Sequence, residues 1–271
     1  MTDWNWLGLP LKASKHAARL DSFNELVHVI LIAGFIFWMT WFVIALLKFS
    51  RKKNPKADYH GIKSNWPYIP IAIMAIFDFV LLFGLSMPYW HDQINTIPTP
   101  GDDAIEIRVI AQQFEWNIHY PGKDGIFGRT DPTLIDDQFN ALGLDRDDPN
   151  GEDDVVSNRI MHLPVNQQVL IYLSSKDMIH SFSMPEFRVK QDVIPGMRIP
   201  IYFTPTMTSV EFAIASNDPE RRFEIACAQL CGNSHHTMRG YVTVESSEAY
   251  ETWLQEEVKK RQEQADDDFF F

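Results

Sequence analysis

Two long apolar runs near the start of the chain constrain its fold more than any other feature. They read VILIAGFIFWMTWFVIALL, residues 29–47, and WPYIPIAIMAIFDFVLLFGLSMPYW, residues 66–90. A helix that crosses a bilayer needs roughly 20 apolar residues, so each run is long enough. Aromatic residues lie at both ends of the second run, as is common at membrane interfaces. We therefore expect a transmembrane hairpin over 27–90, with helices at about 27–48 and 66–89, rather than a buried soluble hairpin or a cleaved signal peptide.

The connection between the two runs, residues 49–65, indicates their orientation. Together with Lys48 it carries six lysine and arginine residues against one acid, Asp58. Basic loops are retained on the cytoplasmic side, so the N-terminal segment 1–26 and the chain beyond residue 90 are expected on the opposite side. The prediction is a multi-pass protein of the bacterial inner membrane, in contact with lipid, whose remaining domain lies in the periplasm.

After a polar linker at 91–103 the pattern becomes that of β-structure. Short β-branched and aromatic segments, separated by turn residues, predict strands within 104–120, 168–175, 198–205, 209–216, 221–229 and 239–246. Such a series predicts a sandwich or Greek-key barrel over 104–246, and hence an α+β membrane protein. The C-terminal segment 247–271 is expected to begin as an amphipathic helix, opened by Ser247 with Glu251 available for capping, and to end in a frayed ADDDFFF tail.

The charge of the chain is concentrated in one segment of this β domain. Residues 122–158 are rich in Asp, Gly and Pro, with ten acidic and three basic residues, in a chain of net charge −12. The acidity argues against a nucleic-acid partner and favours a basic protein partner. The spacing of these acids approaches that of an EF-hand calcium loop. The segment lacks the flanking helices and the glutamate at the twelfth position of such a loop, so a solvated surface insertion is the preferred interpretation.

The only two cysteines, Cys227 and Cys231, lie in CAQLCGNSHHTM, residues 227–238. A disulfide between them would close a small ring and stabilise the fold little. Zinc would leave Met238 without a role. Thiolate, imidazole and thioether are together the donors of copper electron-transfer sites, and Cys231, His235 and Met238 follow the order of such a loop.

A second cysteine changes what such a loop can hold. Two thiolates can bridge two copper ions, and each ion then needs an imidazole of its own. His180, at the end of an apolar stretch upstream, and His235 supply these two. Met238 and the backbone carbonyl of Gln229 complete the weaker positions. Sharing one electron over two metals keeps each bond nearly unchanged on reduction, which favours fast electron transfer.

With these residues in place, the chain resembles subunit II of the cytochrome c oxidases, members of the haem–copper oxygen reductases. Its cysteine loop is similar to the family's binuclear CuA loop, C-x-E-x-C-G-x-x-H-x-x-M. The segments DMIHSF, KQDVIPG and WPYIP are similar to other family segments. The resemblance implies a cupredoxin-like Greek-key domain and the ligands His180, Cys227, Gln229, Cys231, His235 and Met238. Family spacing selects His235 over His236.

Three departures from the family pattern concern neighbouring functions. In the family, a glutamate at the position of Gln229 binds magnesium through its carboxylate at the boundary with subunit I. Gln229 has no carboxylate, so this chain would supply no negative charge to such a magnesium site. Phe114 replaces the tryptophan at which electrons enter, and Trp116 is the next aromatic along. Lys63 stands where a glutamate often marks a proton channel. Asp78, within the second apolar run, is expected to bond a neighbouring subunit.

The resemblance implies an electron-accepting subunit of a cytochrome-c oxidase, a proton-translocating complex of several subunits. A c-type cytochrome would reduce the dicopper centre, and haem in subunit I would receive the electron for oxygen reduction coupled to proton pumping. The chain has no C-x-x-C-H motif, so the donor haem belongs to another protein. The alternatives are a copper-free quinol oxidase subunit II and a membrane-tethered copper carrier.

Overall fold

The computed structural model describes residues 6–56, 59–61, 63–99, 101, 104–137 and 139–268. Asp58 and the phenylalanines at 269–271 lie outside the described residues. The chain divides into two compact units, a helical hairpin at 21–96 and a β domain formed by 97–271 together with residues 1–20. Each unit is described by itself below.

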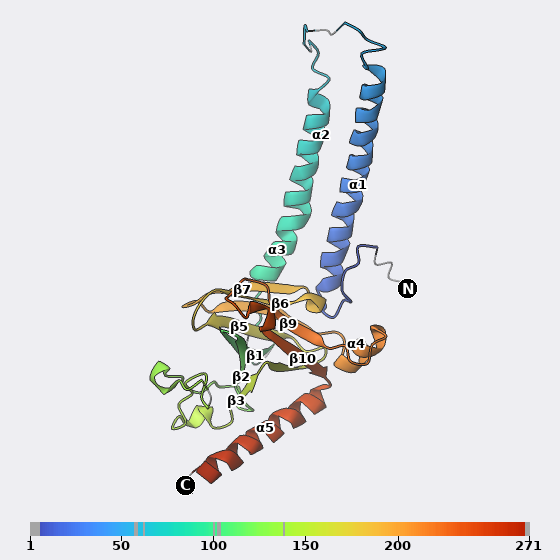
Figure 1. The fold of residues 1–271 in the computed structure, drawn as a ribbon. Helices are drawn as coiled ribbons and strands as arrows, with labels where there is room; N and C mark the ends of the chain where they lie inside the picture. Colours follow the sequence, from blue (N-terminus) through green and yellow to red (C-terminus); the bar gives the residue numbers. More distant parts are fainter. Residues whose placement is uncertain are drawn as a thin grey trace. The chain divides into compact units, whose positions relative to one another are not determined.

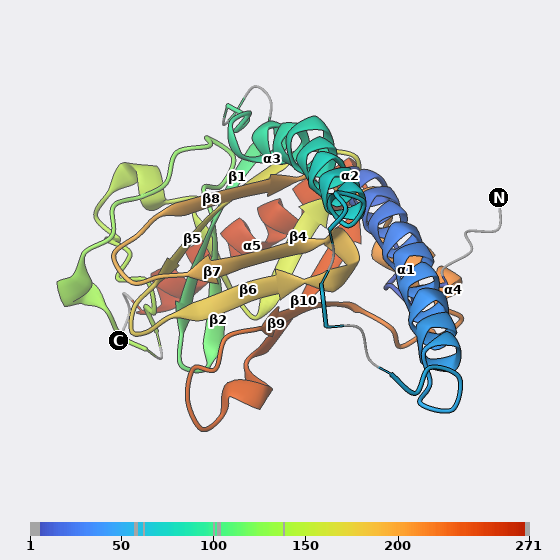
Figure 2. The same ribbon diagram turned by 90° about the horizontal axis from the view of Figure 1, so that it is seen from above.

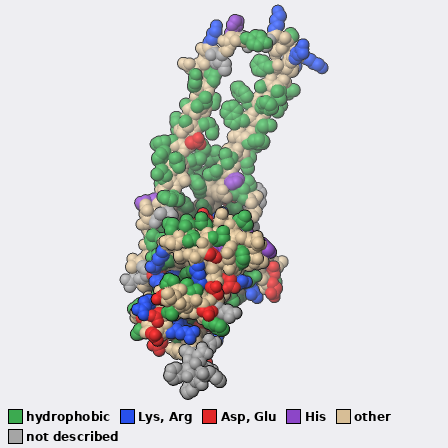
Figure 3. Space-filling model, turned by 60° about the vertical axis from the view of Figure 1, so that its left-hand side comes forward, with side chains coloured by type: hydrophobic (Ala, Val, Ile, Leu, Met, Phe, Trp, Pro, Cys, Tyr) green, Lys and Arg blue, Asp and Glu red, His purple; other side chains and the backbone are tan. Residues whose placement is uncertain are grey.

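The hairpin consists of two long apolar helices joined by the basic loop (Figure 1). Helix α1 spans Ala17–Lys48 and begins well before the apolar run. The second helix runs through α2, Tyr68–Phe79, a π-helical segment, Val80–Ser86, and α3, Met87–Ile94. Both are long and apolar enough to cross a membrane, and hydrophobic side chains cover the face seen in Figure 3. The predicted pair of apolar helices is confirmed.

The π-helical segment in the second helix follows from Pro88. Proline has no backbone N–H, so the usual bond from residue 88 to the carbonyl of Gly84 cannot form. The N–H of Met87 instead bonds to the carbonyl of Leu82, five residues back. A π-bulge widens the helix by this one step and keeps it continuous.

The β domain is a sandwich of two five-stranded sheets (Figures 1 and 2). One sheet has the order β3-β2-β1-β5-β8, with the strands Val155–Asn158, Glu115–Tyr120, Ile105–Gln112, Val169–Ser175 and Ile199–Phe203. The other has the order β4-β10-β9-β6-β7, with the strands Ile160–Pro164, Arg239–Glu245, Phe223–Cys227, His180–Met184 and Val189–Val193.

Aromatic and aliphatic side chains fill the space between the two sheets. Trp116, Phe182 and Phe223 are fully buried there, and the alternating burial along β1 and β10 matches their period of two. The predicted sandwich is therefore confirmed. It is this core that fixes the strand ends from which the cysteine loop extends.

One predicted strand, at 209–216, is wrong. The segment forms a short helix, α4, over Ser209–Ala215. Thr208 and Glu211 make a reciprocal capping box: the Thr208 hydroxyl accepts from the Glu211 N–H, and the Glu211 carboxylate accepts from the Thr208 N–H. Satisfying both backbone donors outweighs the alternation of apolar residues that suggested a strand.

The N-terminal segment belongs to the β domain, which the sequence did not predict. The N–H of Ala13 donates to the carbonyl of Glu186 at 2.9 Å, and its carbonyl accepts from Thr206 at 2.9 Å. The Ser14 hydroxyl donates to the Phe187 carbonyl at 2.7 Å. These bonds add a short extended stretch to the domain directly before α1 begins.

The predicted acidic insertion is the connection between β2 and β3, and many of its own carboxylates hold it in shape. Asp131 and Asp148 cap its two 3-10 turns, Pro132–Leu134 and Pro149–Gly151. The buried carboxylate of Asp154 contacts the His119 ring at 2.7 Å and accepts from the Gly128 N–H at 2.9 Å. These carboxylates therefore cap turns and form hydrogen bonds that stabilise the insertion itself.

The predicted C-terminal helix is α5, Ser247–Asp268, so part of the expected frayed tail is helical. Its cap is Ser246, one residue before the predicted Ser247, whose hydroxyl accepts from the Ala249 N–H. Trp253 stacks on the His162 ring, with the ring centres 4.0 Å apart, and meets Tyr120 edge-on at 5.0 Å. These aromatic contacts attach α5 to the sandwich.

Replacing Trp253 with alanine should loosen α5. We expect a loss of about 2 kcal/mol in the free energy of unfolding, because the side chain is half-buried and its contacts with His162 and Tyr120 of the sandwich are lost. Limited proteolysis should cut within α5 faster than in the unchanged chain. Glu256→Ala, an exposed change on the same helix, is the control; equal cleavage in both variants would contradict the anchoring role.

Candidate metal centre

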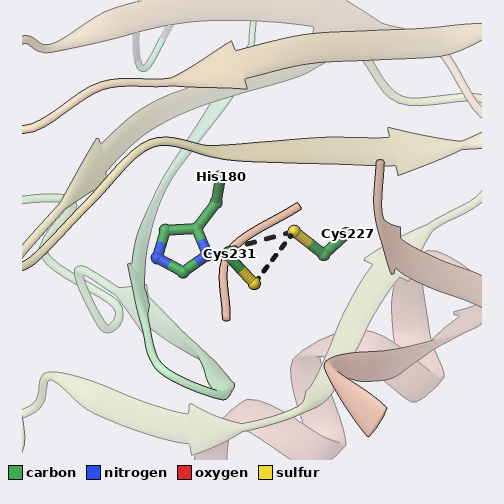
Figure 4. Close-up of side chains that lie close together, drawn as sticks. All are labelled: His180, Cys227 and Cys231. Carbon is green, nitrogen blue, oxygen red and sulfur yellow. Dashed lines mark hydrogen bonds between the residues drawn. The ribbon is translucent and has the colours of Figure 1, made fainter. Parts of the chain in front are cut away.

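Three neighbouring strands bring the predicted ligands together. His180 is the first residue of β6, and Cys227 is the last residue of β9. Because β6 and β9 pair with Phe182 opposite Cys227, His180 and Cys227 lie at the same end of the sheet. The loop 228–238 then returns to β10, bringing Cys231 back over Cys227. Figure 4 shows the His180 ring and the two sulfur atoms converging.

The donor atoms form two similar halves around the pair of sulfurs. The Sγ atoms of Cys227 and Cys231 are 3.7 Å apart, and both cysteines are free. Cys227 Sγ lies 3.9 Å from His180 Nδ1, and Cys231 Sγ lies 3.5 Å from His235 Nδ1. Each sulfur thus has an imidazole nitrogen of its own.

The two remaining predicted ligands complete one half each. Met238 Sδ is 3.7 Å from Cys231 Sγ, and the Gln229 carbonyl is 3.2 Å from Cys227 Sγ. The backbone turn at His235–Thr237 points the His235 ring at Cys231, whereas His236 is exposed. All six residues that the sequence singled out are therefore adjacent.

Two residues that the sequence did not single out brace this arrangement. An Asp177 carboxylate oxygen lies 2.8 Å from His180 Nε2, which leaves Nδ1 to face Cys227. The Gln113 amide donates to the Cys231 carbonyl at 2.7 Å, and the Gln113 N–H donates to Asp177 at 2.7 Å. Such outer contacts orient metal ligands. Only the position of Asp177, three residues before His180, could have hinted at this.

Gly232 makes room for the brace. Its φ of +128° is in the region that favours glycine, and a Cβ there would lie 2.7 Å from the Gln113 amide nitrogen and 3.2 Å from the Phe114 ring. A side chain at this position would push Gln113 and Phe114 away from the loop. The glycine after Cys231 thus allows the β1–β2 turn to close against the cysteine loop.

The surroundings of the two thiols shift their pKa values in opposite directions. Burial acts to raise the pKa of the Cys227 thiol. Hydrogen bonds with the His180 ring, with the backbone at Ser181 and Gln229 and with Cys231 outweigh it, and the pKa falls from 9.0 to about 6. Burial and the contact with Cys227 raise the pKa of Cys231. Without metal, Cys227 is therefore the more readily ionised of the two thiols.

The two aromatic residues proposed as the point where electrons enter differ in exposure. Phe114 is half-buried beside Gly232. Trp116 is fully buried, with its ring edge-on to the His180 ring, the centres 6.2 Å apart. Phe114 therefore keeps some exposed surface, whereas Trp116 has none and packs against the His180 ring.

Comparisons with known proteins bear on this site. The family model for the periplasmic domain of cytochrome c oxidase subunit II matches residues 105–246, more than half of the chain. The alternative cytochrome c oxidase subunit 2 of Bradyrhizobium diazoefficiens is 35% identical over 233 residues, which cover 82% of this chain and 77% of that one. This chain belongs to the cytochrome c oxidase subunit II family. It is a membrane-anchored subunit of a cytochrome c oxidase complex, with a periplasmic domain.

Two further comparisons show lower identity. Cytochrome c oxidase subunit 2 of Cereibacter sphaeroides is 27% identical over 266 residues, 92% of this chain and 79% of that one. The crystal structure of the periplasmic domain of subunit II of cytochrome oxidase from Bradyrhizobium japonicum aligns with a TM-score of 0.41 and 24% identity. That alignment covers 61% of this chain and 99% of that one.

The donor set of this subunit II fits copper. Two cysteine sulfurs, two imidazole nitrogens and a thioether are soft or borderline donors, which suit copper and do not suit magnesium or calcium. His180, Cys231 and Met238 are buried, Cys227 and His235 are half-buried, and Gln229 is exposed. His180, Cys227 and Cys231 already place their ligand atoms within 4.8 Å of one another.

In copper-free oxidase, Cys227 should react with iodoacetamide before Cys231. The thiolate is the nucleophile, so alkylation of Cys227 should rise as pH increases through about 6, well below an ordinary thiol. Mass spectrometry of peptides containing each cysteine measures this. His180→Asn should shift the midpoint upward, since it removes the bond that favours the thiolate. A midpoint near 9 in the unchanged chain, or earlier labelling of Cys231, would contradict the assignment.

Proposed function

We propose that this subunit accepts electrons from a c-type cytochrome at a binuclear copper centre and passes them to haem in subunit I, where oxygen is reduced and protons are pumped. The observation that carries this proposal is the pairing of donors: two free sulfurs 3.7 Å apart, each with its own imidazole Nδ1. The location follows as the bacterial inner membrane, with the copper domain on the periplasmic side.

When bound, the copper pair would supply a one-electron redox couple whose charge is spread over two metals. The residues of the chain do the rest. Cys227 and Cys231 would bridge the pair, His180 and His235 would each bind one ion, and Met238 and the Gln229 carbonyl would take the weaker positions. Asp177 and Gln113 hold His180 and the Cys231 carbonyl in place before any metal arrives. A prearranged site limits the movement that accompanies a change of charge.

Two alternatives account for fewer of these residues. A copper-free quinol oxidase subunit gives no role to the six donors. A copper carrier needs neither the two-halved arrangement nor the long apolar hairpin.

Gln229 is exposed and uncharged, so a magnesium ion at the boundary with subunit I would take no carboxylate from this position.

Metal analysis with EPR spectroscopy of the purified oxidase tests the copper centre. We expect two coppers per subunit II beyond any held by subunit I, and a hyperfine pattern from two equivalent copper nuclei. His235→Asn should abolish that pattern, because one ion loses its imidazole, and the matched control His236→Asn should leave it intact. A single labile copper would favour the carrier, and none would favour the quinol oxidase subunit.

The acidic insertion offers a surface for a basic donor close to this centre. Leu134, Ile135 and Phe139 are exposed on it, Phe139 by 79%, beside the exposed Asp136 and Asp137. Exposed apolar groups within a charged rim are typical of protein-binding surfaces. Asp137 also lies 3.6 Å from the amine of Lys176, and Lys176 directly precedes Asp177, the partner of His180. A donor seated here would be near the copper ligands.

Replacing Asp136 and Asp137 together with asparagine should raise the KM for a lysine-rich c-type cytochrome severalfold at low ionic strength. The difference should fade as salt shortens the Debye length to about 10 Å and below. Steady-state oxidation of the cytochrome measures this. Glu251→Gln with Glu256→Gln removes the same charge from α5 and is the control. An equal rise in both double variants would contradict docking at the insertion.

A further inference from the structure

A cavity of about 280 Å³ lies where the acidic insertion meets β3 and α5. Phe139, Leu142 and Leu144 of the insertion and Val155 of β3 provide apolar walls. Two arginines from distant parts of the sequence also line it, Arg146 from the insertion and Arg261 from α5. The copper ligands do not contribute to this cavity, so its purpose is separate from the redox centre.

The charge of this cavity is opposite to that of the protein. Lys260 also lines it, and the one acid among its lining residues, Glu257, contacts the Lys260 amine at 2.6 Å. The two arginines therefore remain as excess positive charge, in a chain of net charge −12. In such an acidic chain, arginines are ordinarily expected to pair with carboxylates.

Neither arginine forms an ion pair with a carboxylate within the described part of the chain. Arg261 donates to the backbone carbonyl of Asp154 and makes no ion pair there. Arg146 has no hydrogen bond or ion pair among the described side chains. Of the acids beside Arg146, Asp145 pairs with Arg129, and Asp148 accepts the Arg129 N–H at 2.7 Å. Asp145 and Asp148 are thus engaged with Arg129, and Asp147, which follows Arg146 directly, is exposed.

The two guanidinium groups also affect each other. Burial lowers the pKa of Arg261 and the positive charge of Arg146 lowers it further, whereas the charges of Asp154 and Asp153 oppose this. An anion between the two arginines would relieve this repulsion. Each guanidinium has five N–H donors in a planar fork that matches a carboxylate or phosphate group, and only one bond of Arg261 is used by the protein.

We propose that this cavity binds a small organic oxyanion, with its phosphate or carboxylate group between Arg146 and Arg261 and its apolar part against Leu142 and Leu144. The ligand would join the insertion to α5, because one arginine comes from each. It would therefore hold the insertion in a fixed position on the domain. This site is independent of the copper centre and stands even if that proposal fails.

Hydrogen-exchange mass spectrometry of the intact oxidase tests the site. The probe is inorganic phosphate, compared with chloride at the same pH and ionic strength. Phosphate should slow exchange in a saturable way at 139–148 and 257–262. Arg146→Gln should raise the half-saturating concentration about tenfold or more, since it removes a charge-assisted hydrogen bond. Arg146 is exposed, so this variant is expected to fold.

Arg159→Gln is the matched control. Arg159 pairs with Glu115 at 3.1 Å, outside the cavity, so its loss should leave the phosphate effect unchanged. Glycerol 3-phosphate, tested in the same way, distinguishes an organic phosphate ester from free phosphate as the ligand. Stronger protection than by phosphate supports an organic ester, and equal protection supports recognition of the oxyanion group alone. Absence of local protection by both probes, or equal weakening in Arg146→Gln and Arg159→Gln, would overturn the proposal.

Discussion

The approach of two sulfur atoms to 3.7 Å is the constraint on which the rest of the site depends. At this distance two thiolates would repel each other, so the two cysteines cannot both ionise easily. The structure separates their roles by placing His180 beside one sulfur and by burying the other. The strand pairing of β6 with β9, the turn at His235 and the contact of Gln113 with the Cys231 carbonyl all serve to maintain this distance.

Much of this arrangement could be predicted from the sequence because the information is local. Apolar runs of sufficient length specify the hairpin, and the order of Cys227, Cys231, His235 and Met238 within twelve residues specifies the loop. The distant His180 was predicted because a second metal requires a second imidazole. These inferences use chain length and donor chemistry, which the sequence states directly.

What the sequence did not reveal depends on contacts between distant segments. The brace by Gln113 crosses from one sheet to the loop of the other, 118 residues away in sequence. The pairing of Ala13 with Glu186 and Thr206 joins the start of the chain to the middle of the domain. At 209–216 a local capping box overrode the alternation that suggested a strand. Arg146 and Arg261 likewise meet only because α5 packs on β3 beside the insertion.

The insertion therefore has two electrostatic faces, an acidic outer surface and a positively charged cavity against α5. Most of its carboxylates support its own fold, so its net charge overstates what a partner can contact. Asp136 and Asp137 are both exposed; Asp136 accepts the Phe139 N–H within the insertion, and Asp137 lies 3.6 Å from the Lys176 amine. The two proposals, a basic donor at the outer surface and an anion in the cavity, thus use different charges of the same segment.

The most direct measurement of the central claim is anomalous diffraction from crystals of the copper-loaded oxidase, with data on both sides of the copper absorption edge. The account predicts two separate copper peaks between Cys227 and Cys231, one on the side of His180 and one on the side of His235. One peak in fully loaded protein, or continuous density for a bond between the two sulfurs, would contradict it.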